Sequence, residues 1–179
     1  MTTWKENERR YHGVYKRVKV LMLLLLLFPS QVIVDQQIPF RKFLTKEEYL
    51  INECEKSIEC RYLLQALYWE ARGESDKGVV AVAYVILNRT KHPSWPSTVE
   101  GVVTQPWQFS YRMENNFQKG FTDKKQYSRI AMVAQKVLAM ELKNPVGGAT
   151  HYHATSIKAP KWTRKKRVVA VIGNHVFYE

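Results

Sequence analysis

Cysteine is scarce in this sequence, and the common metal-binding motifs are missing. The 179 residues contain two cysteines, Cys54 and Cys60, and without a second pair they form no zinc-ligand pattern. There is no His-Glu-x-x-His motif and no internal repeat. A turn between the two cysteines would allow a disulfide in an oxidising compartment, and two buried free thiols are the alternative.

Acidic residues are also few. The chain has 16 Asp and Glu against 28 Lys and Arg, which gives a formal net charge of +12. Only six of the basic residues lie in the first 19 positions, so the rest of the chain is basic as well. Such a charge suits a polyanionic partner, namely nucleic acid, an anionic membrane surface or the anionic bacterial wall. The alternative is a surface that merely keeps the protein soluble.

The N-terminal segment is basic and leads into a short apolar run, Val20 to Phe28. The run is shorter than the roughly 20 residues of an ordinary transmembrane helix and is typical of a secretory signal. No small-x-small cleavage site follows it. We therefore predict an uncleaved signal-anchor helix in residues 1–34, which keeps the N-terminus cytoplasmic and exports the remainder. A buried core helix after a disordered arm is the alternative.

One folded domain is predicted after this segment. Residues 35–44 are typical of a linker, and Thr45 with Glu48 forms a capping box that marks the start of a domain over residues 45–179. The expected elements are helices over residues 46–57, 59–72, 77–89 and 123–142, a short helix that ends at Val103, an irregular stretch over residues 105–119, and a β-hairpin of residues 168–172 and 175–178.

The second of these helices ends in a carboxylate. From Tyr62 to Trp69 nearly every residue is apolar, and Glu70 follows directly. A helix that is apolar on all sides belongs in a core, where desolvation raises the pKa of a carboxyl group. Glu70 is therefore a candidate general acid, and a solvated charge at a helix end is the alternative.

Glu74 lies four residues further on and would share one face of a continuing helix with Glu70. Cleavage of a glycosidic bond by two carboxylates requires them on opposite sides of that bond, which this spacing does not provide. The pair suits a mechanism with one acid, in which Glu74 orients Glu70, pairs with Arg72 or binds substrate.

Histidines and aromatic residues favour two further interpretations. His151 and His153 on a strand would point to one face, which raises a metal site whose third ligand the sequence does not identify. Aromatic rings with histidines and amides also suit sugars, whose apolar faces stack on rings. The rings that could form such walls are Trp95, Trp107, Phe109, Tyr111, Tyr152 and Trp162, although several must belong to the core.

Several motifs follow one another along the chain. They are Glu70-Ala71-Arg72-Gly73-Glu74, Gly78 to Arg89, Gln108-Phe109-Ser110, Gly148 to His153, Pro160, Trp162 and Ile172 to Tyr178. In this order they resemble the SleB/CwlJ family of cell-wall hydrolases, which includes spore-cortex-lytic enzymes and phage-encoded relatives. The resemblance covers about residues 63–178. It implies an α+β fold, a mostly helical lysozyme-like or lytic-transglycosylase-like domain with a small C-terminal β-hairpin.

The resemblance also implies that Glu70 is the catalytic residue. Other residues expected to bind substrate or to support the site are Glu74, Asn88, Phe109, Tyr111, His151, Tyr152, His153, Trp162 and His175. Where the spore enzymes have a peptidoglycan-binding module, this chain has the predicted anchor. The resemblance therefore favours a membrane-tethered wall enzyme or a phage lysis enzyme.

The resulting hypothesis is a peptidoglycan glycosidase that cleaves between N-acetylmuramic acid and N-acetylglucosamine. A lytic transglycosylase is favoured over a hydrolytic muramidase, because no second carboxylate is obviously placed. We expect a monomer without cofactor or metal, with glycan strands and a membrane as partners and no nucleic acid. The domain would act outside the cytoplasmic membrane. The alternatives are a non-catalytic peptidoglycan-binding module, a metal-dependent hydrolase that uses His151 and His153, and a nucleic-acid-binding protein.

Overall fold

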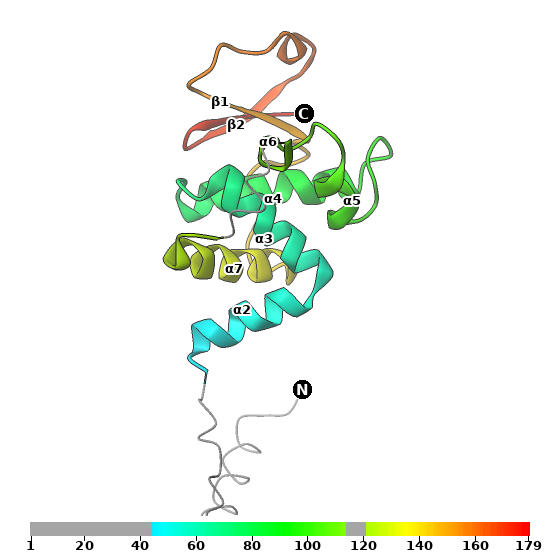
Figure 1. Ribbon diagram of the computed structural model, residues 1–179. Helices are drawn as coiled ribbons and strands as arrows, with labels where there is room; N and C mark the ends of the chain where they lie inside the picture. The colour runs from blue at the N-terminus through cyan, green and yellow to red at the C-terminus, as the bar shows by residue number, and fades with distance from the viewer. Residues whose placement is uncertain (1–43, 114–120) are drawn as a thin grey trace, which may run out of the picture. The chain divides into compact units, whose positions relative to one another are not determined.

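The computed structural model describes residues 44–113 and 121–179. The predicted signal anchor and all of the predicted linker except Leu44 lie outside these residues. The described chain forms a helical part and a small sheet that packs against it (Figure 1). None of the helices in this described part has the length and apolar content that a membrane crossing requires.

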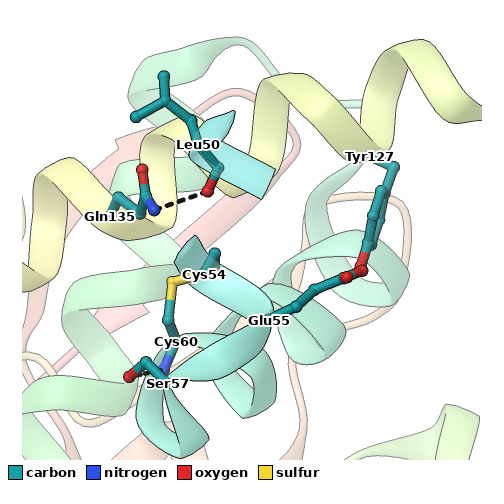
Figure 2. Close-up of a disulfide and its surroundings, with 7 residues drawn as sticks. All are labelled: Leu50, Cys54, Glu55, Ser57, Cys60, Tyr127 and Gln135. Carbon is teal, nitrogen blue, oxygen red and sulfur yellow. Dashed lines mark hydrogen bonds between the residues drawn. A yellow bond between two sulfur atoms is a disulfide. The ribbon is translucent and has the colours of Figure 1, made fainter. Parts of the chain in front are cut away.

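The first helix of the described chain is α2 (Lys46–Lys56), which confirms the helix predicted over residues 46–57. The Thr45 hydroxyl accepts a hydrogen bond from the Glu48 amide, and the Glu48 carboxylate accepts one from the Thr45 amide. This capping box satisfies amide groups that would otherwise lack partners at the helix start. Further along α2, the side-chain amide of Gln135 donates to the Leu50 carbonyl at 2.7 Å and so ties α2 to the last helix (Figure 2).

Helix α3 (Ile58–Ala71) follows after a turn at Ser57. Ser57 has extended backbone angles, ends α2 and caps α3 by accepting a hydrogen bond from the Cys60 amide. This change of direction brings Cys54 and Cys60 together as a disulfide (Figure 2). Of the two states that the sequence left open, the disulfide is therefore the one that forms.

Replacement of both Cys54 and Cys60 with alanine should lower the free energy of unfolding by about 2 kcal/mol, because the bridge closes a short loop in the unfolded chain. Urea denaturation measures this loss. The double variant and the dithiothreitol-treated wild type should show the same reduced midpoint. An unchanged midpoint in both would mean that the bridge does not contribute to stability.

Helix α3 is the centre of the fold. It packs against α2, α4 (Asp76–Thr90), α5 (Val99–Thr104) and α7 (Lys124–Leu138). Its buried residues are Cys60, Leu63, Leu64, Ala66, Leu67, Tyr68 and Ala71. Helix α4 is also almost wholly buried along Gly78 to Ile86, so the valine-rich segment is a core helix as predicted. The helices packed around α3 therefore set the position of its last turn.

The C-terminal part forms a three-stranded antiparallel sheet in the order β1-β3-β2. Strands β2 (Val168–Ile172) and β3 (His175–Tyr178) are the predicted hairpin. The prediction of a hairpin alone was incomplete, because β1 (His151–Ala154) pairs with the other edge of β3. A 3-10 helix, η2 (Lys161–Lys165), lies in the connection between β1 and β2. Strands β1 and β2 contact α4.

Two details of the predicted elements were wrong, namely one helix end and one stretch without a helix. Helix α7 ends at Leu138 instead of residue 142, because Met140 adopts a left-handed conformation with φ 58° and the Glu141 amide closes back on the Lys136 carbonyl. Met140 is consequently 81% exposed and does not belong to the apolar stripe. The stretch predicted to be irregular contains the short helix α6 (Ser110–Met113).

Candidate active site

Glu70 lies in the last turn of α3, at the end of the buried apolar run, and is itself partly exposed. The Tyr152 hydroxyl donates a hydrogen bond to Glu70 Oε2 at 3.1 Å. Burial raises the pKa of the Glu70 carboxyl above its usual value, while the Tyr152 hydrogen bond and the positive charge of Arg89 partly oppose this rise. A carboxyl group of this kind can stay protonated at higher pH than usual and can donate its proton.

Tyr152 reaches Glu70 from the middle of β1. Burial raises the pKa of this phenol well above its ordinary value, and the negative charge of Glu70 raises it further. Tyr152 therefore remains a hydrogen-bond donor. Its ring meets that of His175 edge-on at 5.2 Å and lies 5.9 Å from that of Phe177. The sheet face that these rings share is the one directed at Glu70.

Arg89 is a site residue that sequence reasoning did not single out. Its side chain is only 7% exposed, and its Nε donates to the Thr150 carbonyl at 2.8 Å. Burial lowers the pKa of the guanidinium, whereas the charges of Tyr152 and Glu70 raise it. A charged residue inside an apolar helical segment was the available signal. Its positive charge would stabilise the carboxylate that Glu70 becomes after it gives up a proton.

Glu74 does not lie on a continuing helix with Glu70, because α3 ends at Ala71. Its carboxylate instead accepts hydrogen bonds from the Asn174 amide at 3.1 Å and from Asn174 Nδ2 at 3.0 Å. His175 Nδ1 lies 3.7 Å from the same carboxylate. Of the three roles that the sequence left open for Glu74, these contacts do not favour a pairing with Arg72. Glu74 joins the chain after α3 to the turn between β2 and β3.

Gly173 completes this connection. It has φ +57°, and a Cβ built on it would lie 1.9 Å from Glu74 Oε2. Only a residue without a side chain permits the carboxylate to approach the turn so closely. We call Glu74, Gly173 and Asn174 the hairpin latch. On the opposite side of Glu74, Arg129 donates to its backbone carbonyl at 3.1 Å and thereby fixes the loop.

Asn88 supports the site through the backbone. Its side-chain amide donates to the carbonyls of Gly147 and Ala149, each at 2.8 Å. Together with the bond from Arg89 to Thr150, these contacts fix the segment that leads into β1. Asn88 thus helps to position the strand that holds Tyr152.

His151, His153 and Trp162 lie on the other side of β1, because neighbours of Tyr152 in a strand point to the opposite face. His153 donates through Nδ1 to the Ala154 carbonyl, and its Nε2 shares a hydrogen bond with the Tyr178 hydroxyl, both at 2.8 Å. Trp162 packs on both histidine rings. The structure therefore does not place these three residues beside Glu70.

The two histidines do share one face, as a metal site would require. Burial and the nearby positive charges of Lys166, Arg89 and His92 lower the pKa of His151 to about 4. In the described part of the chain, however, no three His, Cys, Asp or Glu side chains come together in a way that could hold a metal ion. The metal-dependent alternative gains no support from this arrangement.

Phe109 and Tyr111 are buried and form a wall near Glu70 instead of an exposed surface. The Tyr111 ring stacks on that of Trp69 at 6.2 Å, and its pKa is raised to about 12, mainly by burial and in smaller part by the charge of Glu70. Phe109 packs against Tyr111 and under the Arg89 guanidinium. The site thus combines Glu70, Tyr152 and Arg89 with an aromatic wall.

Several known proteins are similar in sequence to this chain. The spore cortex-lytic enzyme of Halalkalibacterium halodurans is 33% identical over 121 residues, which cover 66% of this chain and 34% of that protein. The corresponding enzyme of Bacillus subtilis is 31% identical over 68% of this chain and 37% of its own length. The chain therefore spans little more than a third of the length of these relatives.

Two solved structures resemble the fold as well. The catalytic domain of the germination-specific lytic transglycosylase SleB from Bacillus anthracis matches with a TM-score of 0.54 and 28% identity, over 77% of this chain and 98% of that one. The catalytic domain of the Bacillus cereus SleB protein matches with a TM-score of 0.53 and 31% identity, over 66% of this chain and 91% of that one.

A family model described as Cell Wall Hydrolase matches residues 73–178. This range contains every predicted site residue except Glu70, which lies just before it. Because the match covers more than half of the chain, and the curated relatives agree with it, the family resemblance of the motifs is confirmed and the chain belongs to the cell wall hydrolase family.

Proposed function

We propose that this chain degrades peptidoglycan and that it cleaves the bond between N-acetylmuramic acid and N-acetylglucosamine with Glu70 as its single general acid. The observation that carries the proposal is the state of Glu70, a carboxyl group at a helix end whose pKa is raised by burial and which Tyr152 orients. The similarity to the catalytic domain of a lytic transglycosylase supports the reaction type. The other acid of the motif, Glu74, is hydrogen-bonded to Asn174.

In this mechanism Glu70 donates its proton to the glycosidic oxygen while an oxocarbenium-like centre develops on the muramoyl residue. The Tyr152 hydroxyl and the positive charge of Arg89 stabilise the carboxylate that results. That carboxylate then removes a proton from the muramoyl primary hydroxyl, which closes an anhydro-sugar end. If it activates a water molecule instead, the outcome is hydrolysis. Among the described residues, the groups that act on the Glu70 carboxyl are Tyr152 and Arg89 and include no second carboxylate, so we favour the anhydro product.

Mass spectrometry of digested sacculi tests the reaction. Muropeptides that end in anhydro-muramic acid are the expected product, and a digest by the Glu70→Gln variant provides the blank. Reducing muramic acid ends without any anhydro form would exclude the transglycosylase. Reducing N-acetylglucosamine ends would show that the other glycosidic bond is cleaved.

An extracytoplasmic site of action completes the proposal. Disulfides persist in oxidising compartments, and the Cys54–Cys60 bridge lies at the start of the domain. An anchor in residues 1–34 would hold the domain outside the cytoplasmic membrane, as a monomer that reaches the wall. Fractionation of expressing cells, with and without residues 1–34, checks the anchor.

Tyr152→Phe should shift the alkaline limb of the pH–rate profile to higher pH. The hydroxyl stabilises the charged form of Glu70, so its removal raises the pKa of that carboxyl and keeps the acid protonated over a wider range. At the optimum the rate should fall roughly tenfold, because the carboxyl loses a contact that orients it. Initial rates of sacculus clearing across the pH range measure both effects.

Tyr127→Phe is the matched control for this experiment. It also removes a tyrosine hydroxyl that donates to a glutamate, here Glu55 on α2 (Figure 2). Its pH–rate profile should coincide with that of the wild type. If Tyr152→Phe leaves the alkaline limb in place, Tyr152 does not control the acid.

A further inference from the structure

A small pocket lies between α5 and α6, beside the wall of the candidate active site. Its volume is about 250 Å³, and its lining residues are Thr104, Gln105, Pro106, Trp107, Phe109 and Arg112. Pockets for drug-sized ligands usually measure roughly 300 to 1,000 Å³, so this one suits a single small unit such as one sugar ring.

Trp107 is an unusual residue at the edge of this pocket. Its side chain is 83% exposed, and its backbone has φ +66°, a left-handed conformation that bulky residues rarely adopt. An exposed indole contributes little to folding, so neither burial nor helix capping explains why a tryptophan occupies this position. The left-handed conformation belongs to the turn in which the Gln108 amide donates to the Gln105 carbonyl, and this turn leaves the indole at the edge of the pocket.

Polar groups converge on the same pocket. Within residues 44–113 and 121–179, the buried Gln105 Oε1 has no hydrogen-bond partner, although buried acceptors are normally satisfied. The guanidinium-bearing side chain of Arg112 also lines the cavity. A flat aromatic face beside a free acceptor matches the surface of a sugar, which is apolar on its ring face and carries hydroxyl and amide donors at its edge.

The pocket shares a wall with the catalytic centre. Phe109 lines the pocket and packs against Tyr111 with ring centroids 6.1 Å apart. Tyr111 in turn stacks on Trp69, the residue directly before Glu70. A glycan strand with its cleaved bond at Glu70 could therefore extend toward the pocket along one side of the domain.

We propose that this pocket is a sugar-binding subsite that holds one N-acetylhexosamine unit of the glycan strand on one side of the cleaved bond. Trp107 stacks on the ring face, and Gln105 Oε1 accepts a hydrogen bond from a hydroxyl or acetamido N–H group. The subsite rests on the proposed function, since it assumes a glycan substrate bound at Glu70.

Binding measured without turnover tests the subsite. In the Glu70→Gln background, calorimetry with a tetrasaccharide of alternating N-acetylglucosamine and N-acetylmuramic acid should give roughly tenfold weaker affinity for Trp107→Ala. Trp107→Phe should restore most of it, because a ring face is retained. Gln105→Leu, which keeps the size but lacks the acceptor, should also bind more weakly. Unchanged affinity for Trp107→Ala would overturn the proposal.

Met140→Ala is the matched control, because Met140 is also a large exposed side chain at positive φ but lies at the end of α7. It should bind the tetrasaccharide like the parent. The thermal midpoint of Trp107→Ala should equal or exceed that of the parent, and a clear decrease would show that Trp107 is a structural residue instead.

Turnover of sacculi separates failure of the subsite from failure of the proposed function. If the wild type releases anhydro ends while Trp107→Ala binds normally, the function stands and the subsite is wrong. If the wild type cleaves no substrate and the tetrasaccharide still binds through Trp107, the subsite is correct but the protein is not catalytic.

Discussion

Glu70→Gln is expected to lower the rate of sacculus cleavage by roughly 10³-fold, the range that general acid catalysis contributes. Glutamine preserves the shape of the side chain and can still accept the hydrogen bond from Tyr152, but it has no acidic proton. Binding to sacculi should therefore be retained. Turbidity loss of a sacculus suspension measures cleavage, and co-sedimentation measures binding.

Glu55→Gln provides the control for this substitution. Glu55 is also a glutamate that accepts a hydrogen bond from a tyrosine, namely Tyr127, but it lies on α2. This variant should cleave sacculi at the wild-type rate. Full activity in Glu70→Gln would exclude Glu70 as the acid. A wild type that binds sacculi without clearing them would instead favour the non-catalytic peptidoglycan-binding module.

Stability should show a related pH effect. Because burial raises the pKa of Glu70 in the folded state, ionisation of this group costs more free energy there than in the unfolded chain. The wild type should therefore lose stability as pH rises from the unfolded pKa through the folded pKa. Glu70→Gln lacks this loss. The difference between its thermal midpoint and that of the wild type should therefore increase as pH rises over that interval. Scanning calorimetry at several pH values measures the difference.

The helices could be predicted where a local signal marks them. The capping box at Thr45 and the apolar run before Glu70 both depend on neighbours in sequence, and the structure bears out both helices. The end of α7 could not be predicted in this way. The helical pattern continues to Met140, but the left-handed backbone there ends the helix, and Leu142 turns back so that its carbonyl accepts a hydrogen bond from Tyr84.

The candidate site could also be predicted only where the signal lies in one local segment of the sequence. The position of Glu70 at the end of a buried helix follows from its own segment. The partners of Glu74 do not, because Asn174 is 100 residues away and only the folded sheet brings it near. The contacts of Arg89 could not be predicted either, because the Thr150 carbonyl and the rings of Trp95 and Phe109 come near it only in the folded structure.

Strand periodicity likewise gave a correct but incomplete answer for the histidines. Alternation places His151 and His153 on one face of a strand and Tyr152 on the other. It does not say which face meets α3. The packing of β1 against the helices decides this, and it directs Tyr152 toward Glu70. Long-range packing is therefore what the sequence pattern lacked.

Gly173→Ala is expected to lower the free energy of unfolding by roughly 3 to 5 kcal/mol. A methyl group there would force the buried Glu74 carboxylate away from its two donors on Asn174, in addition to the strain of a left-handed alanine. Cleavage should fall as well, because the displaced hairpin includes β3, which pairs with the strand that holds Tyr152. Urea denaturation and sacculus clearing measure the two effects.

Gly147→Ala distinguishes the effect of losing the contacts of the hairpin latch from the effect of placing an alanine in a left-handed backbone conformation. Gly147 has φ +54°, close to that of Gly173, but a Cβ built on it has no atom within 4 Å. This variant should therefore lose only the roughly 1 to 2 kcal/mol that the left-handed conformation costs an alanine, and it should cleave sacculi normally. If both alanine variants lose the same stability, backbone strain accounts for the whole effect at Gly173, and the contact with Glu74 neither stabilises the hairpin nor positions Tyr152.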